Sequence, residues 1–397
     1  MSQGTFHFHP PRSVLLLCGV VSGLGGAAFL AGLLQAPERA WFNLLLVSYY
    51  LLTLGLAGIV FVALQYVSGA GWSVALRRIP EAMVAGIPLG ALGLAVVFLA
   101  KPSLYPWTIS AQSETATPFR HVWFNWPFFL ARSAVYVACW LTLGFALVHT
   151  SRRQDENGDL AYTRRNVRLS ADFLVVFGVT FWLASSDWIM SLEPEWSSTI
   201  FAVYHFAGLL LGGLAGIILL SAWLWWLGPF RHVLTRAHLH DLGKLLFAFS
   251  TFWMYLWFCQ YMLIWYVNNP EETSYFTRRL DGPWRALFVA NLVVNWGIPF
   301  LILLPKAAKQ RIGVLAAVSV VVLTGRWLDL YLGILPNAGH PTPRSAGWEI
   351  SLLVGALSLF ALVFFVAFGK AAVIPTKDPF LPESLPVQSE RPELVGP

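Results

Sequence analysis

Residues 199–227 read TIFAVYHFAGLLLGGLAGIILLSAWLWWL, without one Asp, Glu, Lys or Arg. A helix needs about 20 mainly apolar residues to cross a hydrocarbon core of about 30 Å. This stretch is longer than that, so it predicts a membrane-spanning helix. The chain as a whole is 57% hydrophobic and 12% charged, whereas soluble domains carry roughly 25% charged residues. The sequence therefore predicts an all-α polytopic membrane protein.

Nine further apolar stretches resemble this one, which gives ten predicted transmembrane helices. They cover residues 13–35, 41–67, 82–100, 122–148, 171–192, 242–267, 284–304, 312–334 and 347–368. The third stretch contains Gly86, Pro88, Gly90 and Gly93, which is typical of a broken helix. We expect a single ten-helix domain over residues 1–368 and a Pro-rich cytoplasmic tail over residues 369–397.

The basic residues of the predicted loops favour one side of the membrane. When the loops are assigned alternately, seventeen Lys and Arg residues fall on the side of the termini and seven on the other. Arg132 and Arg326 lie within predicted helices. The positive-inside rule then places both termini in the cytoplasm. The net charge of +6 follows from this bias, so the sequence does not indicate a nucleic-acid partner.

The residue types that hold redox cofactors are sparse. Cys18, Cys139 and Cys259 occur singly in different predicted helices, without a Cys-x-x-Cys pair for a cluster or a Cys-x-x-Cys-His for attached haem. His205 is the one histidine well inside a predicted helix, whereas a membrane haem with two axial histidines needs two. The sequence predicts no cofactor and no metal in this chain.

Five ionisable residues are predicted to lie in the outer half of the membrane. Asp187 and His205 flank a short turn and should reach a similar depth, about 8–10 Å from the outer edge at the helical rise. Arg326 and Asp329 are three residues apart and share a helix face, and Arg132 reaches the same half. Such residues are costly in a membrane and are usually paired or functional. We interpret them as candidates for a proton path.

A second set of candidates is predicted on the inner side. It consists of Asp172, of Asp241 and Lys244 at the start of the seventh predicted helix, and of Tyr255, Gln260 and Tyr261 farther along that helix. These side chains can hold water or relay a proton. A structural explanation stands beside this one. Arg326 and Asp329 can simply neutralise each other, Asp241 can cap its helix, and His205 can be a satisfied core histidine.

Several motifs in the chain resemble those of ActF, a membrane subunit of alternative complex III. They are GAGWSVALRR at 69–78, DWIMSLEP at 187–194, HDLGKLLFAF at 240–249, QYMLIWY at 260–266 with NPEET at 269–273, and RWLDLY at 326–331. The resemblance covers the second to ninth predicted helices. More distantly, the chain is similar to the NrfD or polysulfide-reductase membrane-anchor superfamily.

This resemblance implies two four-helix bundles, formed by helices 2–5 (about 41–192) and 6–9 (about 199–334), with helices 1 and 10 peripheral to them. It also implies a respiratory or photosynthetic complex in the bacterial inner membrane that oxidises quinol. Its partners would be a sister ten-helix NrfD-like subunit, an iron–sulfur subunit and c-type cytochrome subunits, and the sister subunit would form the main quinol site. The iron–sulfur clusters and c-type haems would belong to those partners. ActF-like subunits contribute scaffold and a proton route, which the resemblance carries to Asp187, Asp241, Lys244, Arg326 and Asp329, and to His205 beside the motifs.

Three functions are consistent with these observations. The first is the cofactor-free subunit just described, within an enzyme complex whose redox centres lie elsewhere. The second is a stand-alone secondary transporter, which would be expected to carry paired broken helices. The third is a purely structural membrane anchor. An apolar gap of about seven helical positions, roughly 10 Å, between inner and outer polar groups would favour the anchor.

Overall fold

The structure is a computed structural model that describes residues 7–110, 118–338 and 347–385. Within these ranges the chain forms helices and no strands. Ten helical segments are long and apolar enough to cross a membrane. The predicted all-α polytopic membrane fold is therefore confirmed.

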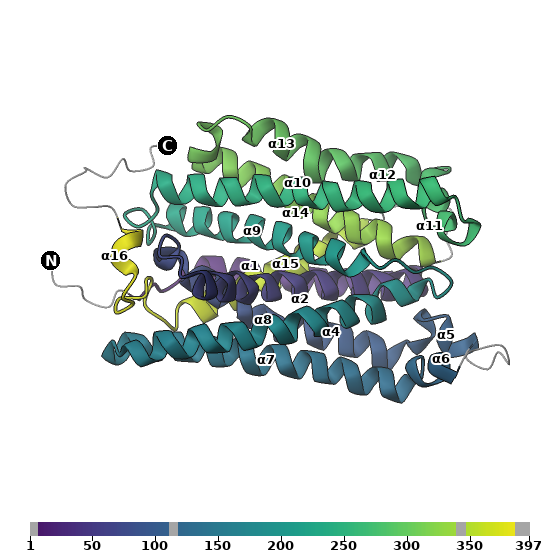
Figure 1. The fold of residues 1–397 in the computed structure, drawn as a ribbon, viewed down its shortest axis with the longest axis horizontal. Helices are drawn as coiled ribbons and strands as arrows, with labels where there is room; N and C mark the ends of the chain where they lie inside the picture. Colours follow the sequence, from purple (N-terminus) through teal and green to yellow (C-terminus); the bar gives the residue numbers. More distant parts are fainter. Residues whose placement is uncertain (1–6, 111–117, 339–346, 386–397) are drawn as a thin grey trace.

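The spanning segments follow the predicted stretches in order (Figure 1). They are α1 (Arg12–Gln35), α2 (Pro37–Ser68), an interrupted third segment that includes α3 (Arg78–Met83) and α4 (Ile87–Ala100), α7 (Trp126–Asn157), α8 (Leu160–Trp188), α9 (Phe201–Leu227), α10 (Arg236–Val267), an interrupted eighth segment made of α12 (Trp284–Leu292), a π-helical turn (Val293–Gly297) and α13 (Ile298–Leu303), α14 (Ile312–Ile334) and α15 (Gly347–Phe368). Short helices connect them: α5 (Trp107–Ser110), α6 (Pro118–Trp123), α11 (Pro270–Leu280) and α16 (Leu381–Ser384).

Several helices extend beyond their apolar stretches. Helix α7 runs on to Asn157 and α8 begins at Leu160, so the two form a hairpin that is longer than their apolar parts. Helix α10 begins at Arg236, where Thr235 and His238 form a capping box. Hydropathy predicts which part of a helix lies in the membrane, but it does not predict the residues at which the helix begins and ends. The expectation that Asp241 caps this helix is wrong, because Asp241 lies in the second turn.

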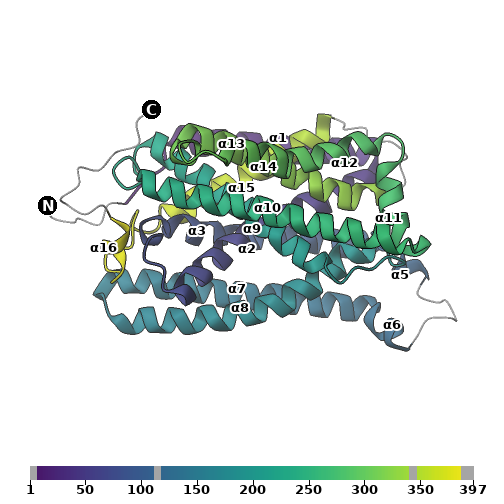
Figure 2. The same ribbon diagram turned by 45° about the horizontal axis from the view of Figure 1, so that its top comes forward.

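Helix α2 forms the centre of the molecule and packs against α4, α8, α9 and α14. In Figures 1 and 2 it runs between the α7–α8 hairpin on one side and the α9, α10 and α14 group on the other. Gly213 permits close packing of α9, since a Cβ there would lie 2.1 Å from the Ala57 Cβ of α2. Helices α1 and α15 form a peripheral pair in which Gly25 and Gly355 bring the two backbones together.

The third segment is irregular, as its glycines and proline predicted. A 3-10 turn at Val84–Gly86 separates α3 from α4. Pro88 stands in the first turn of α4, where its missing N–H costs nothing. Gly90 lets α4 approach α2, because a Cβ at this position would lie 2.4 Å from the Leu52 backbone nitrogen.

The eighth segment is also interrupted, at the π-helical turn Val293–Gly297. Pro299 lacks the backbone N–H that would bond the Asn295 carbonyl in a regular helix. The Ser250 hydroxyl of α10 donates to that carbonyl instead, at 2.6 Å. Glycine at position 325 leaves room for the Asn295 side chain, which would lie 2.8 Å from a Cβ there. Single π-helical turns often occur at functional sites.

Residues 369–385 lie against one end of the bundle, which is called the tail end below (Figure 1). Asp378 forms a buried ion pair with Arg77. The Ser384 hydroxyl donates to the Trp72 carbonyl at 2.7 Å and accepts from the Ala75 N–H at 3.0 Å. Part of the predicted tail is thus packed on the membrane domain, and residues 386–397 lie outside the described residues. The end with α5, α6 and α11 is called the opposite end.

Candidate functional site

Arg132 of α7 and Asp187 of α8 form a buried ion pair near the opposite end. The guanidinium donates from Nε to Oδ2 and from Nη2 to Oδ1, both at 2.8 Å. Trp123 Nε1 also donates to Oδ1, at 3.1 Å, and the Tyr136 hydroxyl donates to Oδ2, at 3.1 Å. Each carboxylate oxygen therefore accepts two hydrogen bonds.

The residues around Arg132 and Asp187 hold both side chains in fixed positions. The Arg132 guanidinium lies 4.2 Å from the centre of the Trp123 ring and donates to the Trp123 carbonyl at 2.8 Å. On the other side of Asp187, the Trp188 indole packs edge-on against Tyr49 and donates to Ser133. A carboxylate with four donors around it has no lone pair left for a mobile proton carrier. The geometry favours the structural explanation for Arg132 and Asp187.

Helices α9, α10, α12, α13 and α14, which correspond to the implied second bundle, hold a different arrangement around Asp329. The Tyr204 hydroxyl and the Asn291 amide both donate to Asp329 Oδ1, the latter at 2.9 Å, and Arg326 pairs with Oδ2. Glycine at position 208 of α9 makes room for the Arg326 guanidinium, which would otherwise lie 2.2 Å from a Cβ. The predicted i,i+3 pair of Arg326 and Asp329 is present, and it belongs to a larger network.

His205 lies beside this network and not beside Asp187. Its Nδ1 shares a hydrogen bond of 3.1 Å with the Tyr49 hydroxyl of α2. Although α8 and α9 pack together, the rings of Tyr49 and Trp188 stand between His205 and the Arg132–Asp187 pair. The five outer candidates thus form two separate groups.

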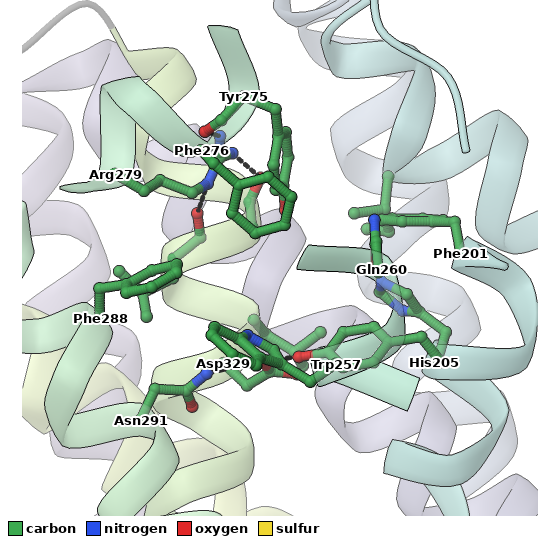
Figure 3. A pocket seen from close by; sticks show the side chains of 15 residues that line it. Phe201, His205, Trp257, Gln260, Tyr275, Phe276, Arg279, Phe288, Asn291 and Asp329 are labelled. Carbon is green, nitrogen blue, oxygen red and sulfur yellow. Dashed lines mark hydrogen bonds between the residues drawn. The ribbon is translucent and has the colours of Figure 1, made fainter. Parts of the chain in front are cut away.

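A cavity of about 30 Å³ joins His205 to Asp329. That volume can hold about two waters, since each needs roughly 10–15 Å³ by this measure. Figure 3 shows Asp329, His205 and Gln260 around it, with Arg279 and Tyr275 farther along. This is the site where the second bundle brings titratable groups and room for water together.

Polar contacts continue from Asp329 toward the tail end. The Asn295 amide donates to Asn291 Oδ1 at 2.7 Å, and Asn291 in turn donates to Asp329. The Ser250 hydroxyl then donates to the Asn295 carbonyl. Asn295 Oδ1 and Ser319 Oγ are buried without a partner among the described residues, which is typical of positions that bind ordered water.

We expect Ser250→Ala to destabilise the protein, because it leaves the Asn295 carbonyl buried without a donor. An orphaned buried acceptor costs about 1–3 kcal/mol, and the thermal midpoint of the protein in nanodiscs should fall accordingly. Thr251→Ala is the matched control, because the Thr251 hydroxyl bonds only the Phe247 carbonyl one turn earlier on its own helix. Equal midpoints for the two variants would contradict the role given to Ser250.

The inner candidates do not come together. Asp172 is exposed on α8, and the half-buried Asp241 forms an i,i+3 pair at 2.6 Å with the exposed Lys244. Tyr255 is exposed on the outside of α10. Gln260 lines the cavity, and Tyr261 stacks on Trp257 with ring centres 5.4 Å apart.

Sequence reasoning missed the residues that connect the network. The uncharged side chains of Tyr49, Tyr204, Asn291 and Asn295 do not stand out in apolar stretches as charged residues do. A signal was present, because Asn291 and Asn295 are four residues apart in an apolar stretch just before Pro299. Among the described residues, no three His, Cys, Asp or Glu side chains are placed to hold a metal ion.

The fold and this site define a polytopic α-helical membrane protein with buried polar networks. Comparisons with protein-family models and with curated proteins gave no match to the chain.

Proposed function

We propose that this chain is a cofactor-free membrane subunit of a quinol-oxidising electron-transfer complex of the alternative complex III type, and that it conducts protons through its second bundle. The observation that carries the proton path is the series of buried polar groups from Tyr204 and Asp329 through Asn291 and Asn295 to Ser250. Asn295 Oδ1 is buried without a partner among the described residues, so this series can hold the water that would carry the proton. The quinol-oxidising complex is proposed from the motif resemblance. The chain would lie in the bacterial inner membrane with its tail end in the cytoplasm.

The apolar gap between Ser250 and the polar groups of the tail end is short. A short gap favours proton conduction over a purely structural anchor. Phe247 precedes Ser250 by three positions, about 4.5 Å along α10 at the helical rise. The Lys309 ammonium lies 5.5 Å from the centre of the Phe247 ring and donates to carbonyls at the end of α13. Phe247, about one helical turn from Ser250, is thus beside a half-buried cation at the tail end. This gap is narrower than seven helical positions.

Coupling would act through Asp329. Quinol oxidation in the sister subunit releases protons and leaves transient charge. A charge near a carboxylate changes the proton affinity of that carboxylate. Asp329 can take a proton carried by water held beside Asn291 and Asn295, and it returns to its bond with Arg326 when the proton leaves for the cavity. The Arg132–Asp187 pair would hold the first bundle rigid beside it.

Purification of the chain from its native membrane in mild detergent tests this function. We expect mass spectrometry to find an iron–sulfur subunit, a second ten-helix protein and c-type cytochromes, and the absorption spectrum to show haem. The preparation should oxidise quinol. A colourless protein that contains only copies of this chain would overturn the proposal and favour a stand-alone transporter.

A further inference from the structure

Two hollows lie close together at the opposite end of the second bundle. The first is the buried cavity at His205 and Asp329. The second is a hollow of about 390 Å³ among the described residues, bordered by Glu193, Arg278 and Asn337. Asp329 and Asn337 are separated by the last turn of α14 and a 3-10 turn, or about 12 Å along the chain at the helical rise. The cavity and the hollow therefore follow each other along the direction of α14.

Two side-chain contacts form the wall between them. Arg279 lines the cavity, Glu193 lines the hollow, and Arg279 Nη2 lies 2.6 Å from Glu193 Oε1. Likewise Tyr275 lines the cavity, Trp196 lines the hollow, and their rings stack with centres 4.0 Å apart. Burial raises the pKa of Tyr275 to about 12, against the opposing effect of Arg279, so its hydroxyl stays protonated near neutral pH.

Of the two partners in the ion pair, Glu193 is the one that can move. Arg279 is 1% exposed, and its guanidinium donates to the carbonyls of Leu332 and Tyr275 at 2.7 Å each. It also lies 3.5 Å from the centre of the Tyr275 ring. Glu193 instead follows a short 3-10 turn, and its other oxygen lies 3.9 Å from Arg278, whose side chain is 51% exposed. The carboxylate therefore has one cationic partner on each side of the wall.

We propose that Glu193 is the group that releases protons outward from the cavity, by moving between Arg279 and Arg278. This inference rests on the proposed function for the origin of the proton and adds the exit of the path. Glu193 lies within one of the quoted motifs, but no role was assigned to it from the sequence.

The proton balance of this step is simple. Protonated Asp329 gives its proton to a cavity water, and the resulting hydronium ion protonates the Glu193 carboxylate. The neutral side chain loses its charge interaction with Arg279 and turns toward the hollow. There it gives the proton to water, and the carboxylate returns to Arg279. One proton leaves the cavity and one enters the hollow in each cycle, while both arginines stay charged.

The first test measures water access to the cavity of the full chain in its purified membrane assembly. Radiolytic labelling in water enriched in oxygen-18 reports how fast water beside Tyr204, His205 and Trp257 exchanges with the bulk. We expect Glu193→Gln to raise labelling at these residues severalfold, because a neutral side chain holds Arg279 less tightly. Glu195→Gln is the matched control, because Glu195 lies on the same turn, borders the same hollow and is exposed. Unchanged labelling in Glu193→Gln would overturn the wall assigned to this pair.

The second test measures the protons translocated per electron in proteoliposomes, beyond the one proton per electron that quinol itself loses on oxidation. We expect Glu193→Gln to lower this ratio at least about tenfold, as removal of a proton-transfer group does, and Glu193→Asp to restore much of it. Glu195→Gln should keep the ratio of the unmodified protein. A normal ratio in Glu193→Gln would overturn the release role alone. If the unmodified assembly oxidises quinol but translocates no protons beyond those that quinol itself loses, the proposed proton conduction fails, so the two failures are distinguishable.

Discussion

Arg132→Leu is expected to destabilise this protein by about 3–5 kcal/mol, the typical cost of leaving one partner of a buried ion pair unmatched. Asp187 is 2% exposed and accepts two hydrogen bonds from Arg132. Without the guanidinium it keeps only the Trp123 and Tyr136 donors. The packing of α7 on α8 near the opposite end should therefore loosen first.

The double variant Arg132→Leu/Asp187→Leu separates charge from packing. Replacement of both partners by apolar side chains of similar size is often neutral or stabilising, so we expect the double variant to regain most of the lost stability. The measurement is the thermal midpoint in nanodiscs, followed by tryptophan fluorescence. A double variant that is less stable than Arg132→Leu would show that the pair is needed for more than mutual neutralisation. In that case the structural role assigned here would be wrong.

The ten helices could be predicted because apolar length is a local property of the sequence. Each apolar stretch contains enough residues to span the membrane, whatever it packs against. The helix ends were less predictable, since α7 and α8 continue past their apolar parts as an amphipathic hairpin. The packing of residues 369–385 depends on partners far away in sequence, such as Arg77 for Asp378. Composition alone indicated a tail that is either disordered or ordered on contact, without deciding between the two.

The candidate site was predictable in part for a related reason. Charged residues in apolar stretches stand out, so Arg132, Asp187, Arg326 and Asp329 were all found. Which of them pair is a matter of helix arrangement, and a shared depth did not bring Asp187 to His205. The interruption of the eighth segment was not predicted, because prolines are common in membrane helices. Its effect depends on Ser250 of another helix, whose hydroxyl donates to the Asn295 carbonyl that Pro299 leaves without its regular helical donor.

Asp329→Asn is expected to uncouple proton translocation from quinol oxidation. Tyr204 and Arg326 bond opposite oxygens of Asp329, and an asparagine keeps only one of these acceptors. We therefore expect Asp329→Asn to lower thermal stability as well, because the Arg326 guanidinium loses its counter-charge. The asparagine cannot take up and release a proton at this position, and we expect the protons translocated per electron, beyond those that quinol itself loses, to fall at least about tenfold. Electron transfer measured with an uncoupler should continue, since the redox centres are proposed to lie in partner subunits.

Asp187→Asn is the matched control from the first bundle, with the same change at a similarly buried carboxylate. It should lower thermal stability, because the Arg132 guanidinium loses its counter-charge. The protons translocated per electron should nevertheless stay normal, because this ratio does not depend on how much protein remains folded. Loss of the ratio in Asp187→Asn with a normal ratio in Asp329→Asn would place the path in the first bundle. Since Asp187 is enclosed by four donors and Asp329 borders a cavity with room for water, the geometry predicts the opposite.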